Sequence, residues 1–399
     1  MNKIIADLHV HSGYSRATSK DMNADLMALW AKKKGINLLA TGDFTHPEYL
    51  KALKKDLKPL GNGLYTTAKE PSVNFMLTAE ISSIYKQGGK VRKIHNLVFA
   101  PSIEVVEKIN SVLDKRGNIK SDGRPILGIS AKELLKIILD ISEDCLFVPA
   151  HAWTPWFSIF GSKSGFDSIE ECFEEYAKYI YAIETGLSSD PEMNWRLSAL
   201  DNITLLSNSD AHSPAKLGRE ANVLDCKPDY YDVIDTIKKK DRKRFLYTVE
   251  FFPEEGKYHF DGHRVCGISF SPAETKKHKG ICPVCNKPLV IGVTNRVDEL
   301  ADRDEGFVPE NAIPSKHLVP LVEIIAGAYA QGVNTKKVKE EYERLVSIHT
   351  EFDILLELGE DEIADIADEK IAEGIKRVRS GDINVVPGFD GEYGKVSIF

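Results

Sequence analysis

Nine side chains able to bind a metal recur in short motifs along the first 212 residues. They are His9, His11, Asp43, His46, Glu80, His95, His151, Asp210 and His212. In DLHVH and NSDAHS the paired ligands are two positions apart, and such residues on a strand point to one face. Imidazole and carboxylate together suit Zn, Mn or Fe, and nine ligands exceed what one ion needs. The set predicts two or three divalent ions, an arrangement typical of phosphoester hydrolysis.

A second cluster, of softer ligands, lies in GHRVCG and KGICPVCNKP. The set is His263, Cys266, Cys282 and Cys285. Two short knuckles separated by a loop have the spacing of a structural zinc ribbon. His263 matches the knuckle spacing as fourth ligand, while His278 and His259 are alternatives. A zinc ion there would stabilise a stretch that has little core of its own.

The elements that must position the first cluster alternate between β-rich runs and amphipathic stretches. The candidate strands are residues 3–10, 38–44, 74–82, 94–101, 145–153, 179–185 and 203–210, and the candidate helices between them include 23–35, 130–141, 168–178 and 191–201. Alternation of this kind predicts βα units and a parallel sheet, and seven strands favour a barrel. In such a barrel the carboxyl ends of the strands converge on one site, where most of the nine residues fall.

The rest of the chain follows a different pattern. The stretch with the cysteines is rich in turn residues, and from about Val319 apolar residues recur at helical spacing. We therefore expect three domains: a barrel over residues 1–247, a zinc ribbon over 248–305 and a helical domain over 306–399. Helices are predicted within 319–332, 334–349 and 360–381.

The motifs DLHVHSGYS, TGDF, AEIS and NSDAHS, with His95 and His151, together resemble the polymerase and histidinol phosphatase (PHP) family. The resemblance covers about residues 1–245. It implies an α/β fold, a distorted seven-stranded β/α barrel with a trinuclear metal site that hydrolyses phosphoesters. The implied ligand sets are His9, His11, Glu80 and Asp210 for one ion, Glu80, His95 and His151 for a second, and His212 with Asp43 or His46 for the third. His9, Glu80, Asp210 and His212 are the implied catalytic residues.

The order of barrel, ribbon and helical end, with GHRVCG, CPVC and VVPGFDGEYGKV, resembles the endonuclease Q family over nearly the whole chain. That resemblance implies nicking of DNA 5′ to deaminated bases (uracil, hypoxanthine, xanthine) and to abasic sites. The products would carry 3′-hydroxyl and 5′-phosphate ends. The implied partner is double- or single-stranded damaged DNA. The implied ions are Zn at the structural site and Mg or Mn at the catalytic site. Zn is an alternative ion for the catalytic site.

Aromatic and basic residues near the expected metals are candidates for binding the substrate. Trp153 and Trp156 lie on a loop directly after His151, with Phe157 and Phe160, and either stack on a base or form a small packed loop. Phe44 lies between two candidate ligands. Arg264 and Arg296 in the ribbon, and lysines of the N-terminal third, are candidates for phosphate contacts.

Charge and composition set limits on partners and compartment. The net charge is −8, yet residues 1–100 carry 15 Lys and Arg against 8 Asp and Glu, while residues 301–399 carry 11 against 21. A local basic face can bind phosphates, and the acidic end is expected to be a scaffold. No apolar run approaches the ~20 residues of a membrane span, so we expect a soluble cytoplasmic protein. A sliding-clamp partner has no clear motif at the C-terminus.

Two other functions fit parts of the sequence. A small-molecule phosphatase of the histidinol-phosphate type would use the barrel but would not need the ribbon or the helical end. A DNA-binding module that has lost its metals would keep the fold without the complete ligand set. The full set of metal-capable residues and the long C-terminal extension favour a DNA endonuclease over both.

Overall fold

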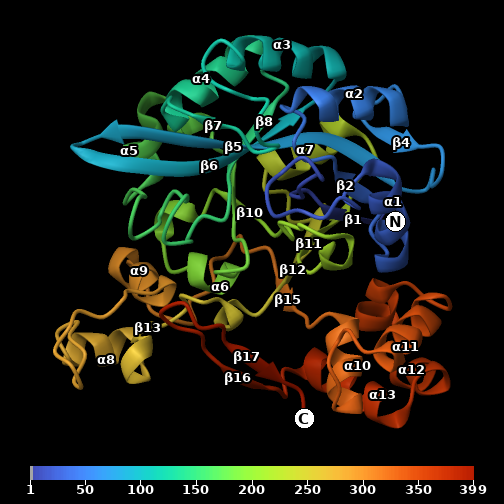
Figure 1. The fold of residues 1–399 in the computed structure, drawn as a ribbon, viewed down its shortest axis with the longest axis vertical. Helices are drawn as coiled ribbons and strands as arrows, with labels where there is room; N and C mark the ends of the chain where they lie inside the picture. Colours follow the sequence, from blue (N-terminus) through green and yellow to red (C-terminus); the bar gives the residue numbers. More distant parts are fainter. Residues whose placement is uncertain (1–2) are drawn as a thin grey trace.

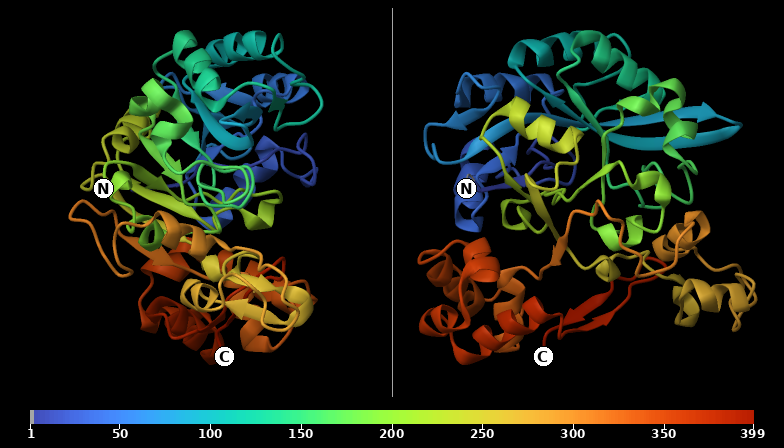
Figure 2. Two further views of the ribbon diagram at one scale, coloured as in Figure 1. Left: turned by 90° about the vertical axis from the view of Figure 1, so that its left-hand side faces the viewer. Right: turned by 180° about the vertical axis from the view of Figure 1, so that it is seen from behind.

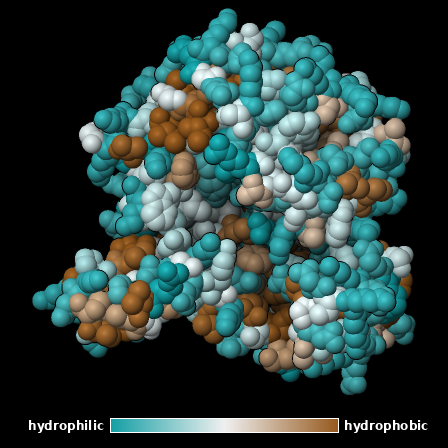
Figure 3. All heavy atoms as spheres, in the orientation of Figure 1, coloured by the Kyte–Doolittle hydropathy of each residue, from teal (hydrophilic) through white to brown (hydrophobic). Residues whose placement is uncertain are grey.

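The computed structural model describes residues 3–399. A body of strands and helices lies above two smaller lobes, one containing the cysteine motifs and one made of helices (Figure 1). The view from behind places the two lobes on opposite sides beneath the body (Figure 2). Figure 3 shows a notch at the lower edge of the molecule, between the two lobes. No helix among residues 3–399 is long and apolar enough to cross a bilayer.

The elements follow one another along the chain with these bounds. The strands are β1 (Lys3–Asp7), β2 (Leu38–Ala40), β3 (Leu57–Pro59), β4 (Tyr65–Thr67), β5 (Asn74–Gln87), β6 (Lys90–Ala100), β7 (Ile126–Leu127), β8 (Leu146–Pro149), β9 (Ala182–Glu184), β10 (Thr204–Leu206), β11 (Ala221–Asp225), β12 (Phe245–Glu250), β13 (Asp261–His263), β14 (Ile268–Phe270), β15 (Ser315–His317), β16 (Asn384–Val386) and β17 (Lys395–Ser397). The α-helices are α1 (Ala24–Lys34), α2 (Pro47–Asp56), α3 (Ile103–Leu113), α4 (Ala131–Ile141), α5 (Ile169–Phe173), α6 (Pro191–Asn194), α7 (Tyr230–Lys238), α8 (Pro272–Lys277), α9 (Val293–Leu300), α10 (Leu321–Tyr329), α11 (Lys336–Val346), α12 (Glu360–Ile366) and α13 (Glu369–Ser380).

All seven predicted strands are present, as β1, β2, β5, β6, β8, β9 and β10, but they do not form a purely parallel sheet. β1, β2 and β5 are parallel neighbours, whereas β6 runs antiparallel to both β5 and β8. The reversal occurs at Gly88 and Gly89, whose positive φ values of 59° and 76° suit the two-residue turn of a hairpin. A parallel sheet would need a crossover connection between β5 and β6. The hairpin takes its place, so the sheet contains both parallel and antiparallel neighbours.

Single backbone contacts bring the carboxyl ends of the remaining strands together. Beyond β8, the amide of Ala152 donates to the carbonyl of Glu184, at 2.9 Å. β9 and β10 are parallel partners. Beyond β10, Ala211 bridges Val10, and its carbonyl accepts from the amide of His11 at 3.0 Å. The segments after β1, β8, β9 and β10 therefore lie next to one another.

Additional strands extend the sheet on the other side of β1. β11 pairs antiparallel with β1, β12 with β11, and β15 adds to β12 in parallel. The sequence pattern did not predict these three strands. β15 comes from the chain after the cysteine motifs, so the lower lobes are joined to the body through the sheet.

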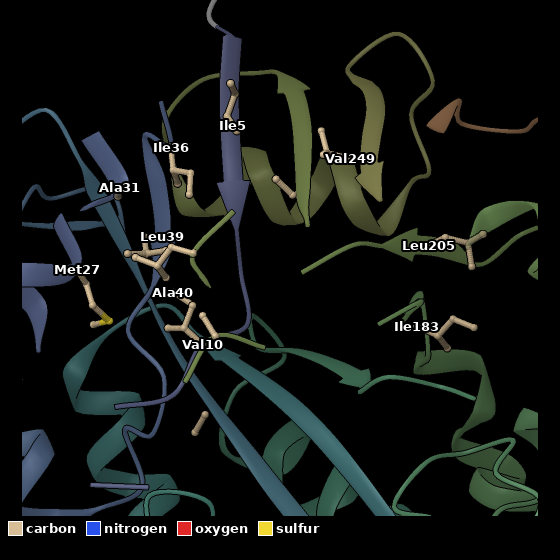
Figure 4. Packing of buried hydrophobic residues seen from close by; sticks show 14 of the residues in the cluster. Ile5, Val10, Met27, Ala31, Ile36, Leu39, Ala40, Ile183, Leu205 and Val249 are labelled. Carbon is tan, nitrogen blue, oxygen red and sulfur yellow. The ribbon is translucent and has the colours of Figure 1, made fainter. Parts of the chain in front are cut away.

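The seven predicted strands are mostly buried on both faces, which explains their apolar runs. Ile5, Leu39 and Ile183 belong to the core between the strands and the surrounding helices, and Figure 4 shows several members of this core. Alternate residues, such as Leu8, Leu38 and Leu206, belong to a second core that α7 also enters. The period-2 alternation places successive side chains in opposite cores.

Helices occur at the predicted places along the chain, but some are shorter than predicted or divided in two. Residues 23–35 and 130–141 form α1 and α4, but 191–201 holds the one-turn helix α6 and a separate 3₁₀ turn. The range 360–381 divides into α12 and α13. The C-terminal hairpin of β16 and β17 returns to the other lobe, where the amide of Phe260 donates to the carbonyl of Gly388 at 2.9 Å.

Candidate metal centre

Seven of the nine predicted ligands converge on one site, five of them just after strand ends and two, Glu80 and His95, within the long strands β5 and β6. Their ligand atoms form three overlapping groups, each within 4.8 Å: His9, His11 and Glu80; His11, Asp210 and His212; Glu80, His95 and His151. Glu80 is central, with one carboxylate oxygen 2.7 Å from Nδ1 of His95 and 3.0 Å from Nε2 of His151. Its other oxygen lies 3.2 Å from Nε2 of His11. One carboxylate therefore belongs to two of the three groups.

The backbone at the strand ends is strained in the way that functional sites often are. Asp43, His151 and Asp210 have φ values of 48°, 30° and 46°, in the left-handed region that residues with a Cβ rarely adopt. Gly186, at φ 62°, packs against His151, and a Cβ on this glycine would lie 2.6 Å from the Cβ of His151. At His151 and Asp210 this left-handed backbone comes just after a strand, and both side chains belong to the metal-capable groups.

The site contains buried polar atoms that an ion would satisfy. Nε2 of His9, Nε2 of His11 and Oδ1 of Asp210 are buried and have no hydrogen-bond partner. Buried polar groups almost always have partners, so three such atoms facing one another fit metal ligands. Burial raises the pKa of Glu80, but the charges of His95 and Arg124 and hydrogen bonds from neighbouring histidines outweigh it and lower that pKa well below its usual value.

Asp43 and His46, which the resemblance offered for a third ion, lie elsewhere. Both oxygens of Asp43 are already bonded: Oδ1 accepts from Nδ1 of His11 at 3.0 Å, and Oδ2 accepts from Ser12 and Ser15. His46 precedes α2, and its ring lies 4.8 Å from that of Tyr14. Neither residue belongs to one of the three groups, and their role as ligands stays a prediction. Asp43 contacts Nδ1 of His11, and His212 groups with His11 and Asp210.

Two residues of the site were missed in the sequence. Glu184 accepts from Nδ1 of His9 at 3.0 Å, and Arg124 lies 3.1 Å from Glu80. Glu184 ends β9, and His9, His151 and Asp210 likewise come at or just after the ends of their strands, so its position in YIYAIET was a usable signal. Arg124 comes from a long loop between α3 and β7, where the sequence carries no periodic pattern.

Glu184 contacts two of the metal-capable histidines, His9 and His151, which leads to a first prediction. Its second oxygen accepts from the backbone amide of His151 at 2.8 Å, and the first also accepts from Asn208 at 3.0 Å. Glu184→Gln replaces one acceptor by a donor. Partners that orient ligands contribute about 10- to 100-fold to metal affinity, so we expect a loss of that size in a chelator-competition titration. The exposed Glu175→Gln serves as control, and equal affinities of the two variants would contradict the role of Glu184.

A pocket of about 450 Å³ opens beside the metal-binding residues. It is lined by Arg16, Ser82, His95, Asp122, Arg124, Ile126, His151, Thr154, Trp156, Phe157, Gly186, Leu187, Ser188 and Asp210. Apolar rings and two arginines therefore surround one side of the histidine and carboxylate cluster. This combination fits a ligand that has both a flat apolar part and a negative charge.

The predicted substrate-binding residues divide into two groups. Trp156 is 41% exposed and lines the pocket, and Arg264 is exposed on the cysteine lobe. Trp153 is 1% exposed, donates to Asn194 at 2.8 Å and so belongs to the packed loop. Phe44 is fully buried in the core.

Arg296 also differs from its prediction as a phosphate contact. Its guanidinium is buried, pairs with Asp167 and Glu299, and donates to the carbonyls of Phe160 and Phe166. With its donors used in this way, Arg296 attaches α9 to the loop after β8. Phe44, Trp153 and Arg296 are therefore corrected to structural roles.

The cysteine motifs form one compact group. Ligand atoms of His263, Cys266, Cys282 and Cys285 all lie within 4.8 Å, and the six cysteines are free of disulfides. Sγ of Cys285 lies 3.7 Å from Nδ1 of His263. Of the alternatives, His278 stacks on Phe270, and His259 is not part of the group. Three cysteines and one histidine in this arrangement fit a tetrahedral structural zinc site.

Comparison with known proteins gives relatives over the whole length. The family model described as the MJ0043 C-terminal domain matches residues 320–382. The chain is 31% identical to protein YqxK of Bacillus subtilis, over 99% of this chain and 100% of YqxK. It is 34% identical to protein MJ0043 of Methanocaldococcus jannaschii over 65% of this chain, a match that spans only 33% of the length of that relative.

Two solved structures match nearly the whole chain. The lesion-specific endonuclease PfuEndoQ of Pyrococcus furiosus is 32% identical, with a TM-score of 0.88, covering 99% of this chain and 95% of the other. An endonuclease Q in complex with a 27-mer duplex substrate, with an abasic lesion at its active site, is 33% identical with a TM-score of 0.87. That match covers 100% of this chain and 97% of the other.

Proposed function

This chain belongs to the endonuclease Q family, and on that premise we propose that it nicks DNA on the 5′ side of deaminated bases and abasic sites. The proposed products carry 3′-hydroxyl and 5′-phosphate ends. The observation that carries the proposal is the convergence of Glu80, Asp210 and five histidines on one site, in a chain similar to an endonuclease bound to abasic DNA.

Three domains follow from the same premise. Residues 1–247 would be the distorted seven-stranded barrel of PHP enzymes, with β1, β2, β5, β6, β8, β9 and β10 as its strands. The contacts of Ala152 with Glu184 and of His11 with Ala211 support a closed ring. Residues 248–305 would be the zinc ribbon, and residues 306–399 the helical domain.

The three ligand groups would each hold one divalent ion. Glu80 would belong to two of them, and His212 with Asp210 would complete the third. Mg or Mn suits the carboxylates, and Zn suits the imidazoles. Ions bound there supply Lewis acidity, which lowers the pKa of water and neutralises phosphoryl oxygens.

The protein's own side chains prepare this site in two ways. Glu184 and Asp43 accept from Nδ1 of His9 and His11, which fixes the tautomer and leaves each Nε2 free to bind an ion. Arg124 brings a positive charge into the pocket beside Glu80. A DNA phosphate at that point would gain a charge-assisted hydrogen bond. The damaged base, which is paired weakly or absent, is the nucleotide most easily turned out of the duplex.

Trp156 is the proposed aromatic contact with DNA. We expect Trp156→Ala to weaken binding of a uracil-containing duplex by about tenfold or more, because stacking of one base on an aromatic ring contributes about 1–3 kcal/mol. Fluorescence anisotropy with an uncleavable duplex measures this. Tyr231→Ala is a matched control, since Tyr231 is 51% exposed and lies outside the pocket. Equal affinities of the two variants for DNA would contradict the proposed contact between Trp156 and DNA.

An assay of substrate class tests the proposal against its alternative, a small-molecule phosphatase. Purified protein with Mg or Mn is given duplexes carrying uracil, hypoxanthine or no lesion, and separately histidinol phosphate. We expect incision of the damaged duplexes and no release of phosphate from histidinol phosphate. Turnover of histidinol phosphate without incision would support the phosphatase. Binding of DNA irrespective of damage, without cleavage, would indicate a module that has lost catalysis.

A further inference from the structure

A separate group of metal-capable side chains lies where the body meets the lower lobes. Ligand atoms of Asp190, Glu192 and His317 are within 4.8 Å of one another. Oδ2 of Asp190 lies 3.2 Å from Nε2 of His317, while its Oδ1 caps α6. Asp190 and Glu192 come from the chain after β9, and His317 ends β15, more than a hundred residues later.

Glu250 lies beneath this group and faces it. In the parallel pair of β12 and β15, Glu250 is the register partner of His317, and partners in register point to the same face of a sheet. The Glu250 side chain is 0% exposed. Its Oε2 accepts from the hydroxyl of Thr185 at 3.2 Å, but Oε1 has no hydrogen-bond partner. A fully buried carboxylate oxygen without a partner is costly unless a further group binds it.

Carboxyl groups outnumber basic side chains around this group. Glu254 also interacts electrostatically with Asp190 and His317, which makes four carboxylates around one histidine. Among residues 3–399, no lysine or arginine lies within ion-pair distance of these carboxylates. Among residues 3–399, the basic side chain at ion-pair distance from these carboxyl groups is His317, beside Asp190.

We propose that Asp190, Glu192 and His317, beside the unpartnered carboxylate oxygen of Glu250, bind a divalent cation that neither the catalytic cluster nor the ribbon accounts for. One imidazole and two carboxylates suit an ion such as Zn²⁺ or Mn²⁺. The site is reached from solvent through Glu192, which is exposed, and it is closed at the opposite end by Glu250. The proposal does not depend on the reaction that the protein catalyses.

The position of the ion gives it a structural role. It would tie the start of α6 to β15, and β15 leads directly into the helical lobe. The loop between β9 and Asp190 also contains Gly186, which packs against His151, and Leu187, which lines the catalytic pocket. Fixing one end of this loop would stabilise the arrangement of body and helical lobe.

The test counts bound metal in full-length protein. Wild type and His317→Gln are equilibrated with excess Mn²⁺ or Zn²⁺ and freed of unbound metal, and the metal per chain is measured by inductively coupled plasma mass spectrometry. We expect His317→Gln to bind one equivalent less, and to lose part of the metal-dependent rise in Tm. His349→Gln is the matched control, because His349 is outside every metal-capable group among residues 3–399.

A second variant, Asp190→Asn, serves if His317→Gln does not fold. Asparagine caps a helix as well as aspartate does, so this variant should keep the N-cap of α6. We expect the same loss of one equivalent. Full metal content in a folded variant of either kind would overturn the proposal. Anomalous diffraction at the metal edge, with a peak between Asp190 and His317, would support it directly, and an absent peak in metal-soaked crystals would contradict it.

Discussion

Glu80→Gln is expected to reduce kcat for nicking at least about 10³-fold while the protein remains folded. Removing one preorganised electrostatic group from an active site costs about 10²–10³ in kcat, and Glu80 belongs to two of the three ligand groups. Glutamine has nearly the same shape but carries no charge. It leaves His95, His151 and Arg124 facing a neutral amide. The measurement is a single-turnover nicking assay on an abasic duplex.

A matched variant separates this effect from a general loss of charge. Glu133→Gln changes an exposed carboxylate on α4 that pairs with Arg116, and we expect its rate to equal that of wild type. Metal content should fall in Glu80→Gln and stay unchanged in Glu133→Gln. A rate for Glu80→Gln within tenfold of wild type would contradict the assignment of Glu80 as a shared ligand.

The second large effect is expected at the cysteine lobe. Cys282→Ser should bind one zinc ion less per chain and lose the folded structure of residues 261–292. Cys282 is buried among the other three ligands, and this stretch consists mainly of turns, two short strands and a one-and-a-half-turn helix. Small metal-bound units of this kind depend on the ion for folding. Limited proteolysis should cut the variant here within minutes, under conditions in which wild type resists.

Another buried cysteine provides the control for Cys282→Ser. Cys226 lies next to α7, far in sequence from the zinc-binding motifs, and Cys226→Ser should keep the full zinc content and the resistance to protease. Binding of DNA should weaken in Cys282→Ser, whereas Glu80→Gln should bind DNA without cutting it. Full zinc content in Cys282→Ser, with no new cleavage sites, would show that the lobe folds without this ligand.

The sequence predicted the strands and most of the ligands because both depend on local patterns. Apolar runs of four to eight residues marked all seven strands, and an i, i+2 pair such as His9 and His11 can be read directly. The knuckle spacing likewise identified four metal-capable residues, His263, Cys266, Cys282 and Cys285, which the structure brings together. Metal-capable residues such as His9, His151 and Asp210 could be predicted because each follows the apolar run of a strand.

What the sequence did not predict depends on contacts between distant segments. Arg124 reaches Glu80 from an irregular loop, and β15 joins β12 although 64 residues, 251–314, lie between them in the chain. Asp43 has the same sequence context as the true cluster residues, yet neighbouring serines satisfy its carboxylate. Spacing alone does not separate a ligand from the residue that orients it.

The aromatic and basic residues show the same limit. Trp153 and Trp156 are three positions apart on one loop, but one is packed inside and the other faces the pocket. Arg296 was expected to contact phosphate, whereas its donors are used by the loop after β8. Burial decides these roles, and burial follows from the packing of the cysteine lobe against the body.

The central claim is most directly tested by mapping the cut on a duplex with one abasic site. The strand carrying the lesion is labelled at its 5′ end, incubated with the protein and Mn or Mg, and resolved at single-nucleotide resolution beside an undamaged duplex. We predict one product that ends in a 3′-hydroxyl immediately 5′ to the lesion, with the undamaged duplex intact. A cut on the 3′ side of the lesion, equal cutting of both duplexes, or no cut with any divalent metal would contradict the account.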